Sequence, residues 1–320
     1  MTSPSIPATP SETPSRNWLE LPPDLTTSIF HRVGALDIFM SARKVCRTWR
    51  QLCSDPEMWR VMDLKYTGDH LSDFDLRKLA KKAVDLSGGQ LIELSLHHFT
   101  DDELLNYVAD RSSQLRRLRL FFCFSVTNDG LSEMVKKLPL LEELSLYRIS
   151  ISNQAIEAAG KYCPQLKSFK LYNPDYGYPD LGCDEEAMAI AENMQGLHHL
   201  QLFGNAITTD GLVAIIENCP HLESLDLRQC LHVANLEPDL LKRLSHQMKF
   251  LKLTYDSLND LEFLDEVEDE YDDLNSFDGD GPSGLQSDID LVSDEFDYND
   301  DDDFEDDHDD DSGGSDMYYD

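Results

Sequence analysis

Positive charge is scarce in this sequence, and long hydrophobic runs are missing from it. The 320 residues carry 27 Lys and Arg against 62 Asp and Glu, a formal net charge of −35. Phosphate backbones and anionic lipid surfaces repel such a chain, so we expect no direct nucleic-acid or membrane partner. The longest apolar runs fall far short of the roughly 20 residues that span a bilayer. Residues 1–17 lack the basic start and apolar segment of a secretory signal.

Paired cysteines and catalytic motifs are missing as well. The seven cysteines are scattered, with no C-x-x-C pair, which favours free thiols in a reducing compartment over a disulfide framework. We therefore expect the nucleus, the cytoplasm or both. No phosphate-binding loop, dinucleotide-binding glycine pattern or H-E-x-x-H spacing is present. The sequence thus predicts a protein that is not an enzyme and has no cofactor and no metal site.

The acidic residues are concentrated near one end of the chain. Residues 256–320 hold 29 of them and no Lys or Arg, whereas residues 1–64 hold seven acidic and seven basic side chains. Too few apolar residues accompany the charges of the last segment for it to fold alone. The sequence therefore predicts a disordered Ser/Pro arm at 1–16, a helical module at 17–63, a repetitive body at 64–255 and a disordered polyacidic tail at 256–320.

The body repeats the pattern L-x-x-L-x-L about seven times. Successive copies start 24 to 31 residues apart, and a degenerate unit at Trp59–Leu64 precedes them. This period is typical of leucine-rich repeats. Each alternating stretch predicts a strand, and the apolar spacing that follows it predicts a helix. The expected fold is an α/β solenoid with a concave parallel sheet and convex helices around one shared core. The copies begin at Leu91, Leu115, Leu141, Leu166, Leu197, Leu222 and Met248.

The concave face is the expected binding surface for a protein client. Residues between the inward leucines alternate onto this face. One column holds four consecutive aromatic residues, and basic residues stand in the columns beside it. Tyr, Phe and Arg are favoured in protein-binding hot spots; the alternative is that the rings pack on one another. The predicted binding residues are Arg117, Arg119, Phe121, Tyr147, Lys170, Tyr172, Phe203 and Arg228.

The module at 17–63 predicts short helices. The first has Leu25, Ile29 and Phe30 on its apolar face, and a second apolar pattern runs from Ile38 to Trp49 after Asp37 as N-cap. A module of this size has difficulty covering its own core. Some of its apolar surface should therefore meet another protein or the first repeat.

Two motifs in this module carry a family resemblance. The segment Leu21–Leu25 matches the L-P-x-[DE]-L opening of the F-box, and the segment Val45–Trp49 matches its V-C-[KR]-x-W centre. Four cysteines fall just after a strand or at a helix end, where we expect small buried hydrophobic residues. These positions resemble the cysteine-containing repeat subtype, so residues 18–255 resemble plant F-box/LRR-repeat proteins. The four cysteines are Cys123, Cys163, Cys219 and Cys230.

The resemblance implies a non-catalytic substrate adaptor of an SCF-type (Skp–cullin–F-box) ubiquitin ligase. In that family the F-box docks on the Skp adaptor, which binds a cullin scaffold with its RING subunit, and the repeats hold a protein client for ubiquitination. The sequence does not separate core from contact residues, and a helical cap on the array is the other interpretation of the module. By matching position, the motif residues are Leu21, Pro22, Leu25, Ile29, Val45, Cys46 and Trp49.

The polyacidic tail leaves alternatives open. Its charge suits a basic partner, histones included, or a contact with the basic residues of the chain's own concave face; a merely solvating tail is the simplest alternative. Leucine-rich repeats followed by acidic residues also resemble acidic leucine-rich nuclear phosphoproteins, which are histone-binding or chaperone-like. The F-box motif and the longer, cysteine-containing repeats stand against that second resemblance.

Overall fold

The computed structural model describes residue 18 and residues 21–66, 71–172 and 182–260, which belong to a single unit. The Ser/Pro arm, residues 173–181 and most of the polyacidic tail lie outside the described residues. None of the described helices is long and apolar enough to cross a membrane.

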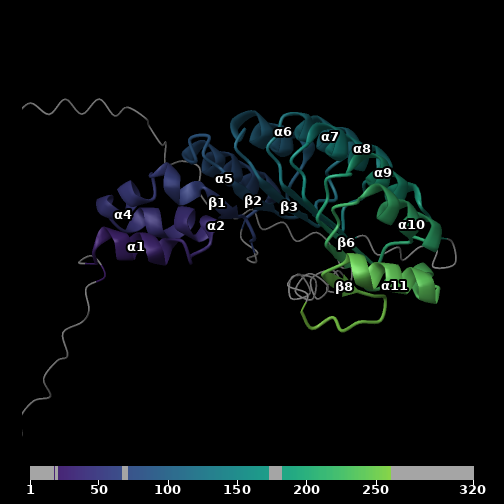
Figure 1. Cartoon of the computed structure of the whole chain (residues 1–320). Coiled ribbons are helices and arrows are strands. Elements are labelled where there is room, and N and C mark those ends of the chain that lie inside the picture. Colours follow the sequence, from purple (N-terminus) through teal and green to yellow (C-terminus); the bar gives the residue numbers. More distant parts are fainter. Residues whose placement is uncertain (1–17, 19–20, 67–70, 173–181, 261–320) are drawn as a thin grey trace, which may run out of the picture. The chain divides into compact units, whose positions relative to one another are not determined.

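Short helices build the N-terminal module (Figure 1). Phe30 meets the ring of Trp49 edge-on, with ring centroids 5.1 Å apart. The indole N–H of Trp59 donates to the Cys53 carbonyl at 2.8 Å, which satisfies the one polar atom of a buried ring. The elements are α1 (Pro23–Phe30), α2 (Ala35–Asp37), the π-helical turn η2 (Ile38–Ala42), α3 (Arg43–Val45), α4 (Arg47–Leu52) and the 3-10 turn η3 (Pro56–Trp59).

The second apolar pattern of the module is not one helix. Cys46 has extended backbone, with φ −158° and ψ 169°, and its Sγ accepts a hydrogen bond from the Trp49 amide at 3.4 Å, which starts α4. Asp37 has helical backbone and makes no capping hydrogen bond. The predicted Asp37 cap is therefore wrong: the helical segment begins earlier, at Ala35 after Gly34, and the side chain that does cap a helix here is Cys46, at the start of α4. The apolar spacing continues across the break and so does not reveal it.

Eight parallel strands follow as one sheet in chain order (Figure 1). The strands line the inner side of the repeats and the helices lie outside them, which confirms the predicted fold class. Leu94, Leu118 and Leu144 are in register on adjacent strands and fully buried. The elements are β1 (Val61–Asp63), α5 (Asp73–Leu86), β2 (Glu93–Leu96), α6 (Asp102–Arg111), β3 (Arg117–Phe121), α7 (Asn128–Lys136), β4 (Glu143–Tyr147), α8 (Asn153–Tyr162), β5 (Ser168–Tyr172), α9 (Glu185–Asn193), β6 (His199–Phe203), α10 (Thr209–Asn218), β7 (Ser224–Asp226), the 3-10 turn η4 (Leu231–Val233), α11 (Pro238–Gln247) and β8 (Phe250–Lys252).

One hydrophobic core runs from the helical module into the repeats. It extends from Phe30 to Met248 without a gap between the two parts. Trp59 stands at the junction, where its ring lies 4.9 Å from that of Phe39. The strand β1, from the predicted degenerate unit, pairs with β2. Part of the module's apolar surface is therefore covered by the first repeat, as the module's small size requires.

Four buried thiols connect neighbouring repeats. Each donates to a backbone carbonyl 25 to 28 residues earlier in the chain, in the preceding repeat. Burial raises the pKa of the Cys163 and Cys230 thiols to about 12 and that of Cys219 to about 11, so all three stay protonated donors at neutral pH. The pairs are Cys123 with His97 at 3.3 Å, Cys163 with Val135 at 3.6 Å, Cys219 with Met194 at 3.6 Å and Cys230 with Leu202 at 2.6 Å.

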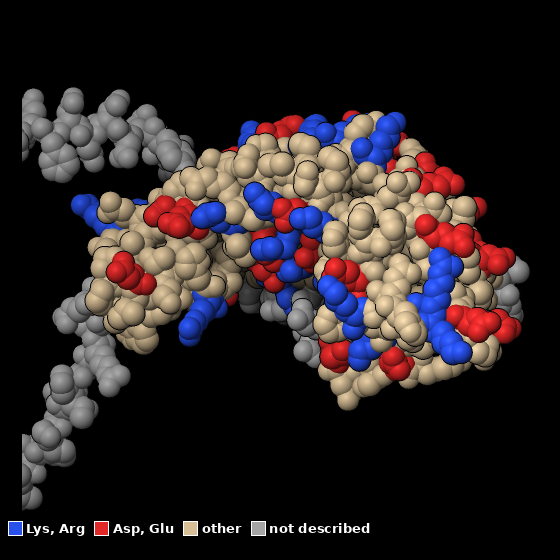
Figure 2. Space-filling view, in the orientation of Figure 1, with Lys and Arg blue, Asp and Glu red and all other residues tan. Residues whose placement is uncertain are grey.

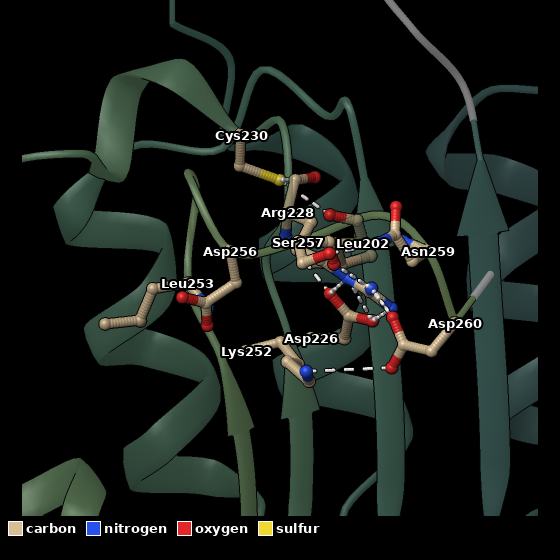
Figure 3. Close-up of polar contacts among 10 residues, drawn as sticks. All are labelled: Leu202, Asp226, Arg228, Cys230, Lys252, Leu253, Asp256, Ser257, Asn259 and Asp260. Atoms are coloured by element: carbon tan, nitrogen blue, oxygen red, sulfur yellow. Dashed lines mark hydrogen bonds and ion pairs between the residues drawn. The ribbon is translucent and has the colours of Figure 1, made fainter.

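Arg228 closes the C-terminal end of the sheet (Figure 3). Its side chain is 4 % exposed and forks onto the Asp226 carboxylate, with Nη2 and Oδ2 2.6 Å apart. Its Nη1 donates to the Ser257 carbonyl at 2.7 Å and to the Asp260 carboxylate, which Lys252 also approaches at 3.6 Å. The first residues of the acidic segment are thus held against the last two strands.

The thiols can be tested with an alkylating reagent. At pH 8 we expect Cys183, which is exposed, to react at least ~100-fold faster than Cys163, Cys219 and Cys230, because burial and a raised pKa leave almost no thiolate at those three. Peptide mass spectrometry after a short exposure measures this, with urea-unfolded protein as the control in which all thiols react. Rapid modification of the three in the folded protein would contradict the thiol–carbonyl hydrogen bonds.

The closure by Arg228 can be tested with a matched pair of variants. Arg228→Gln leaves the largely buried Asp226 without its cation, so we expect the free energy of unfolding to fall by about 3 kcal/mol. Arg243→Gln makes the same charge change at an exposed pair with Glu217 and should cost less than about 1 kcal/mol. Urea unfolding measures both, and hydrogen exchange should speed up at β8 only in the first. Equal behaviour of the two variants would refute the closure.

Candidate functional site

The helical module leaves three of its large apolar motif residues exposed. On α1, Thr26 and Phe30 face the core, whereas Leu25 and Ile29 lie one position earlier in the helix and remain 54 % and 38 % exposed. Val45, at the end of α3, is 52 % exposed. Exposed apolar side chains that lie together on a surface mark interaction sites. We call Leu25, Ile29 and Val45 the exposed trio.

The other four motif residues have contacts within the module. Cys46 caps α4, and Trp49 packs on Phe30. Leu21 is half-buried, and the carbonyl of the exposed Pro22 accepts a hydrogen bond from the Thr26 hydroxyl at 3.2 Å. The structure thus separates the motif residues that make contacts within the module from those that stay exposed. Apolar spacing in the sequence does not show this difference. Adaptor contact by the seven residues stays a prediction.

The predicted aromatic column forms a ladder of neighbouring rings on the sheet. Phe121, Tyr147, Tyr172 and Phe203 are register neighbours on four adjacent strands. The first two rings are stacked, 4.5 Å apart and 3° from parallel, and the last two lie 4.8 Å apart with their planes tilted by 39°. This spacing follows from the strand separation of about 4.8 Å, which suits ring stacking. We call these four residues with His97, which stacks on Phe121 at 4.9 Å, the aromatic ladder.

Members of the aromatic ladder are only 3–6 % exposed. This burial agrees with the alternative interpretation of the aromatic column, in which the rings pack on one another. A contact with a client stays a prediction for these residues. The same holds for Arg228, which continues the column but whose guanidinium is engaged with Asp226, Ser257 and Asp260.

The predicted basic residues stand beside the ladder and are paired with two carboxylates. Glu93, Arg117 and Glu143 occupy one column of neighbouring strands. Glu93 accepts from Arg117 at 2.7 Å and pairs with Arg119 at 2.8 Å, while Glu143 lies 3.2 Å from Lys170 and 3.8 Å from Arg119. We call these five residues the charged cluster. Figure 2 shows Lys and Arg side chains interleaved with Asp and Glu in the region where Figure 1 labels β2 and β3.

The two glutamates are the site residues that the sequence did not predict. Both occur in the columns of the concave face, but only pairing across strands shows that they hold the cations in place. The available signal was the alternation of opposite charges at one column position of successive repeats. Within the described residues, no group of three or more His, Cys, Asp or Glu side chains is placed to hold a metal ion.

Comparisons with known proteins match both parts of this structure. Residues 18–65 match the F-box-like family, residues 76–182 match the LRR repeats of the FBD-associated F-box protein At5g56370, and residues 194–215 match a leucine-rich repeat. The F-box-like match contains the exposed trio, and the second match contains the charged cluster and all of the aromatic ladder except Phe203.

Relatives in Arabidopsis thaliana extend the match over most of the chain. F-box protein SKIP19 is 44 % identical over 301 residues, which cover 93 % of this chain and 98 % of that protein. Putative F-box/LRR-repeat protein 9 is 45 % identical over 233 residues, which cover 71 % of this chain and 93 % of that protein. With the three matched regions and this near full-length likeness, the chain belongs to the F-box/LRR-repeat family.

Proposed function

We propose that the protein is the substrate-recognition adaptor of an SCF-type ubiquitin ligase. Family membership supports an adaptor role in general, and the observation that carries the proposal is the exposed trio. Leu25, Ile29 and Val45 stay in water although the same module buries Phe30, Phe39 and Trp59. Burial of such side chains in a partner stabilises by about 25 cal/mol per Å² of apolar surface. The partner proposed for this surface is a Skp-type adaptor, with cullin and RING subunits joined through it.

The rigidity of the module favours binding at this surface. The Phe30–Trp49 contact and the Cys46 cap hold α1 and α4, so the backbone that carries Leu25 and Ile29 loses little further freedom on association. Binding costs less when the surface is already ordered in the free protein. The continuous core from the module into the repeats then keeps a client held on the sheet at a set place relative to the ligase machinery. Such an adaptor acts by proximity and carries out no chemistry of its own.

The remaining proposals concern the client, the tail and the compartment. The client would bind the sheet face that carries the aromatic ladder and the charged cluster. Residues 261–320 lie outside the described part of the chain, so a basic partner or an internal contact for them rests on their charge alone. A location in the nucleus or the cytoplasm is supported by the free thiols, four of which serve as internal hydrogen-bond donors.

The histone-binding or chaperone-like alternative depends mainly on that acidic segment. Family membership and the exposed trio favour the ligase adaptor. Affinity purification separates the two: Skp and cullin accompany an SCF adaptor, whereas histones without them accompany the alternative.

The exposed trio can be tested by co-purification with a Skp adaptor. Leu25→Asp together with Val45→Asp places two charges where the interface needs apolar surface, and we expect Skp binding to weaken at least ~100-fold. The variant should unfold at the same urea concentration as the wild type, because both side chains are already exposed. The measurement is the amount of Skp and cullin retained by the tagged full chain.

Phe74→Asp is the matched control, since this phenylalanine is exposed on α5 and lies beyond the F-box-like match at residues 18–65. It should leave Skp retention unchanged. If the wild-type chain retains neither Skp nor cullin, or if both variants retain Skp equally, the proposed adaptor surface is wrong.

A further inference from the structure

The acidic side chains of the charged cluster are more buried than its basic side chains. The side chains of Glu93 and Glu143 are 15 % and 17 % exposed, whereas that of Arg117 is 41 % exposed and those of Arg119 and Lys170 are each 32 % exposed. The acids therefore lie beneath the bases. A molecule that approaches this part of the sheet meets the cations first, on a chain whose formal net charge is −35.

The cluster also carries a surplus of positive charge. Three cations share two carboxylates, so one unit of positive charge is left over. The many acidic residues elsewhere do not cancel it at the surface, because salt screens charges beyond about 8 Å at physiological ionic strength. Hydrogen bonding to Glu93 raises the pKa of the Arg117 guanidinium, which keeps it charged.

The cations keep donors for a further acceptor. Arg117 uses Nε toward Glu93, and Arg119 uses Nη1 toward the same carboxylate. A guanidinium has five N–H donors, so each side chain can bond a second carboxylate while it remains held by the first. Glu93 and Glu143 thus pre-order the cations, and the binding of an anion needs little rearrangement.

We propose that the charged cluster binds an acidic, Asp- or Glu-bearing segment of the client protein. This inference rests on the proposed client role of the repeats and names the chemistry that they recognise. One carboxylate neutralises the surplus of one charge, whereas a phosphate dianion would leave the site negative. Nucleic acid is disfavoured because its affinity needs many phosphate contacts. The aromatic ladder beside the cluster is almost fully buried, so the cations of the cluster are the part of this face that a client segment can reach.

The test uses the full chain bound to its Skp adaptor and a defined peptide probe. A short rhodamine-labelled peptide in which Glu and Ser alternate is titrated by fluorescence anisotropy, next to the same peptide with Gln for Glu and one with phosphoserine for Ser and Gln for Glu. We expect the Glu peptide to bind at least ~10-fold more tightly than the Gln peptide and more tightly than the phosphopeptide, with an affinity that falls as salt rises.

Two variants that move the charge in opposite directions give the decisive comparison. Arg117→Gln with Arg119→Gln should weaken binding of the Glu peptide at least ~10-fold, and Glu143→Gln, which adds to the surplus, should strengthen it about 3-fold. Loss of packing alone would not strengthen binding. Arg116→Gln, at an exposed pair with Glu142 outside the cluster, is the matched control and should change nothing.

Each other outcome overturns the proposal. Equal affinity for the Glu and Gln peptides, preference for the phosphopeptide, or a Glu143→Gln variant that binds more weakly would each show that the cluster does not select a carboxylate. Skp retention by every variant is measured in the same samples. If retention is normal and the peptide results fail, only this inference falls; if the wild type retains no Skp, the proposed function falls instead.

Discussion

A single register runs through all eight strands and determines what the inner face of the sheet can present. One repeat cannot bury its own leucines, so neighbouring repeats must stack with their inward residues in phase. Leu94, Leu118 and Leu144 share one row for this reason. Because side chains alternate along a strand, the residues between the leucines are forced into columns as well. The aromatic ladder occupies one of these columns and the charged cluster the next two, and the packing of the core is what aligns all three.

The same need to bury apolar surface joins the helical module to the repeats. The helical module is too small to cover its own core, and the first repeat has an end that needs covering. Trp59 and Phe39 meet at this junction, and one core continues through it. What the junction does not cover is the exposed trio. The surface proposed for the ligase machinery and the surface proposed for the client are therefore positioned by one packed interior, whose inter-repeat contacts include the thiol–carbonyl hydrogen bonds.

Charge in this protein has to be considered locally. The formal net charge of −35 describes mainly the last 65 residues, of which 29 are acidic and none is Lys or Arg. In the charged cluster, Glu93 and Glu143 lie under three cations and leave a positive outer layer. At the end of the sheet, Arg228 and Lys252 hold Asp260. Hydrogen bonding to Arg228 lowers the pKa of Asp260, so this contact persists at neutral pH and is lost only at a pH below 3.8.

The sequence by itself determined the repeats, their strands, the columns of the inner face and the F-box motifs, because period-2 alternation and a repeat of 24 to 31 residues are local properties of the chain. Tertiary structure decided how those residues are used. Neighbours elsewhere in the fold determine whether Leu25 or Phe30 faces the core. They also determine whether Cys46 continues a helix or caps one, and whether the ring of Tyr147 is exposed or stacked on another ring. Gly160 shows the same limit: a Cβ there would lie 2.6 Å from the carbonyl oxygen of Asn193, in the next repeat's helix. Apolar spacing records which residues can be buried, but only the packed neighbours determine which of them are.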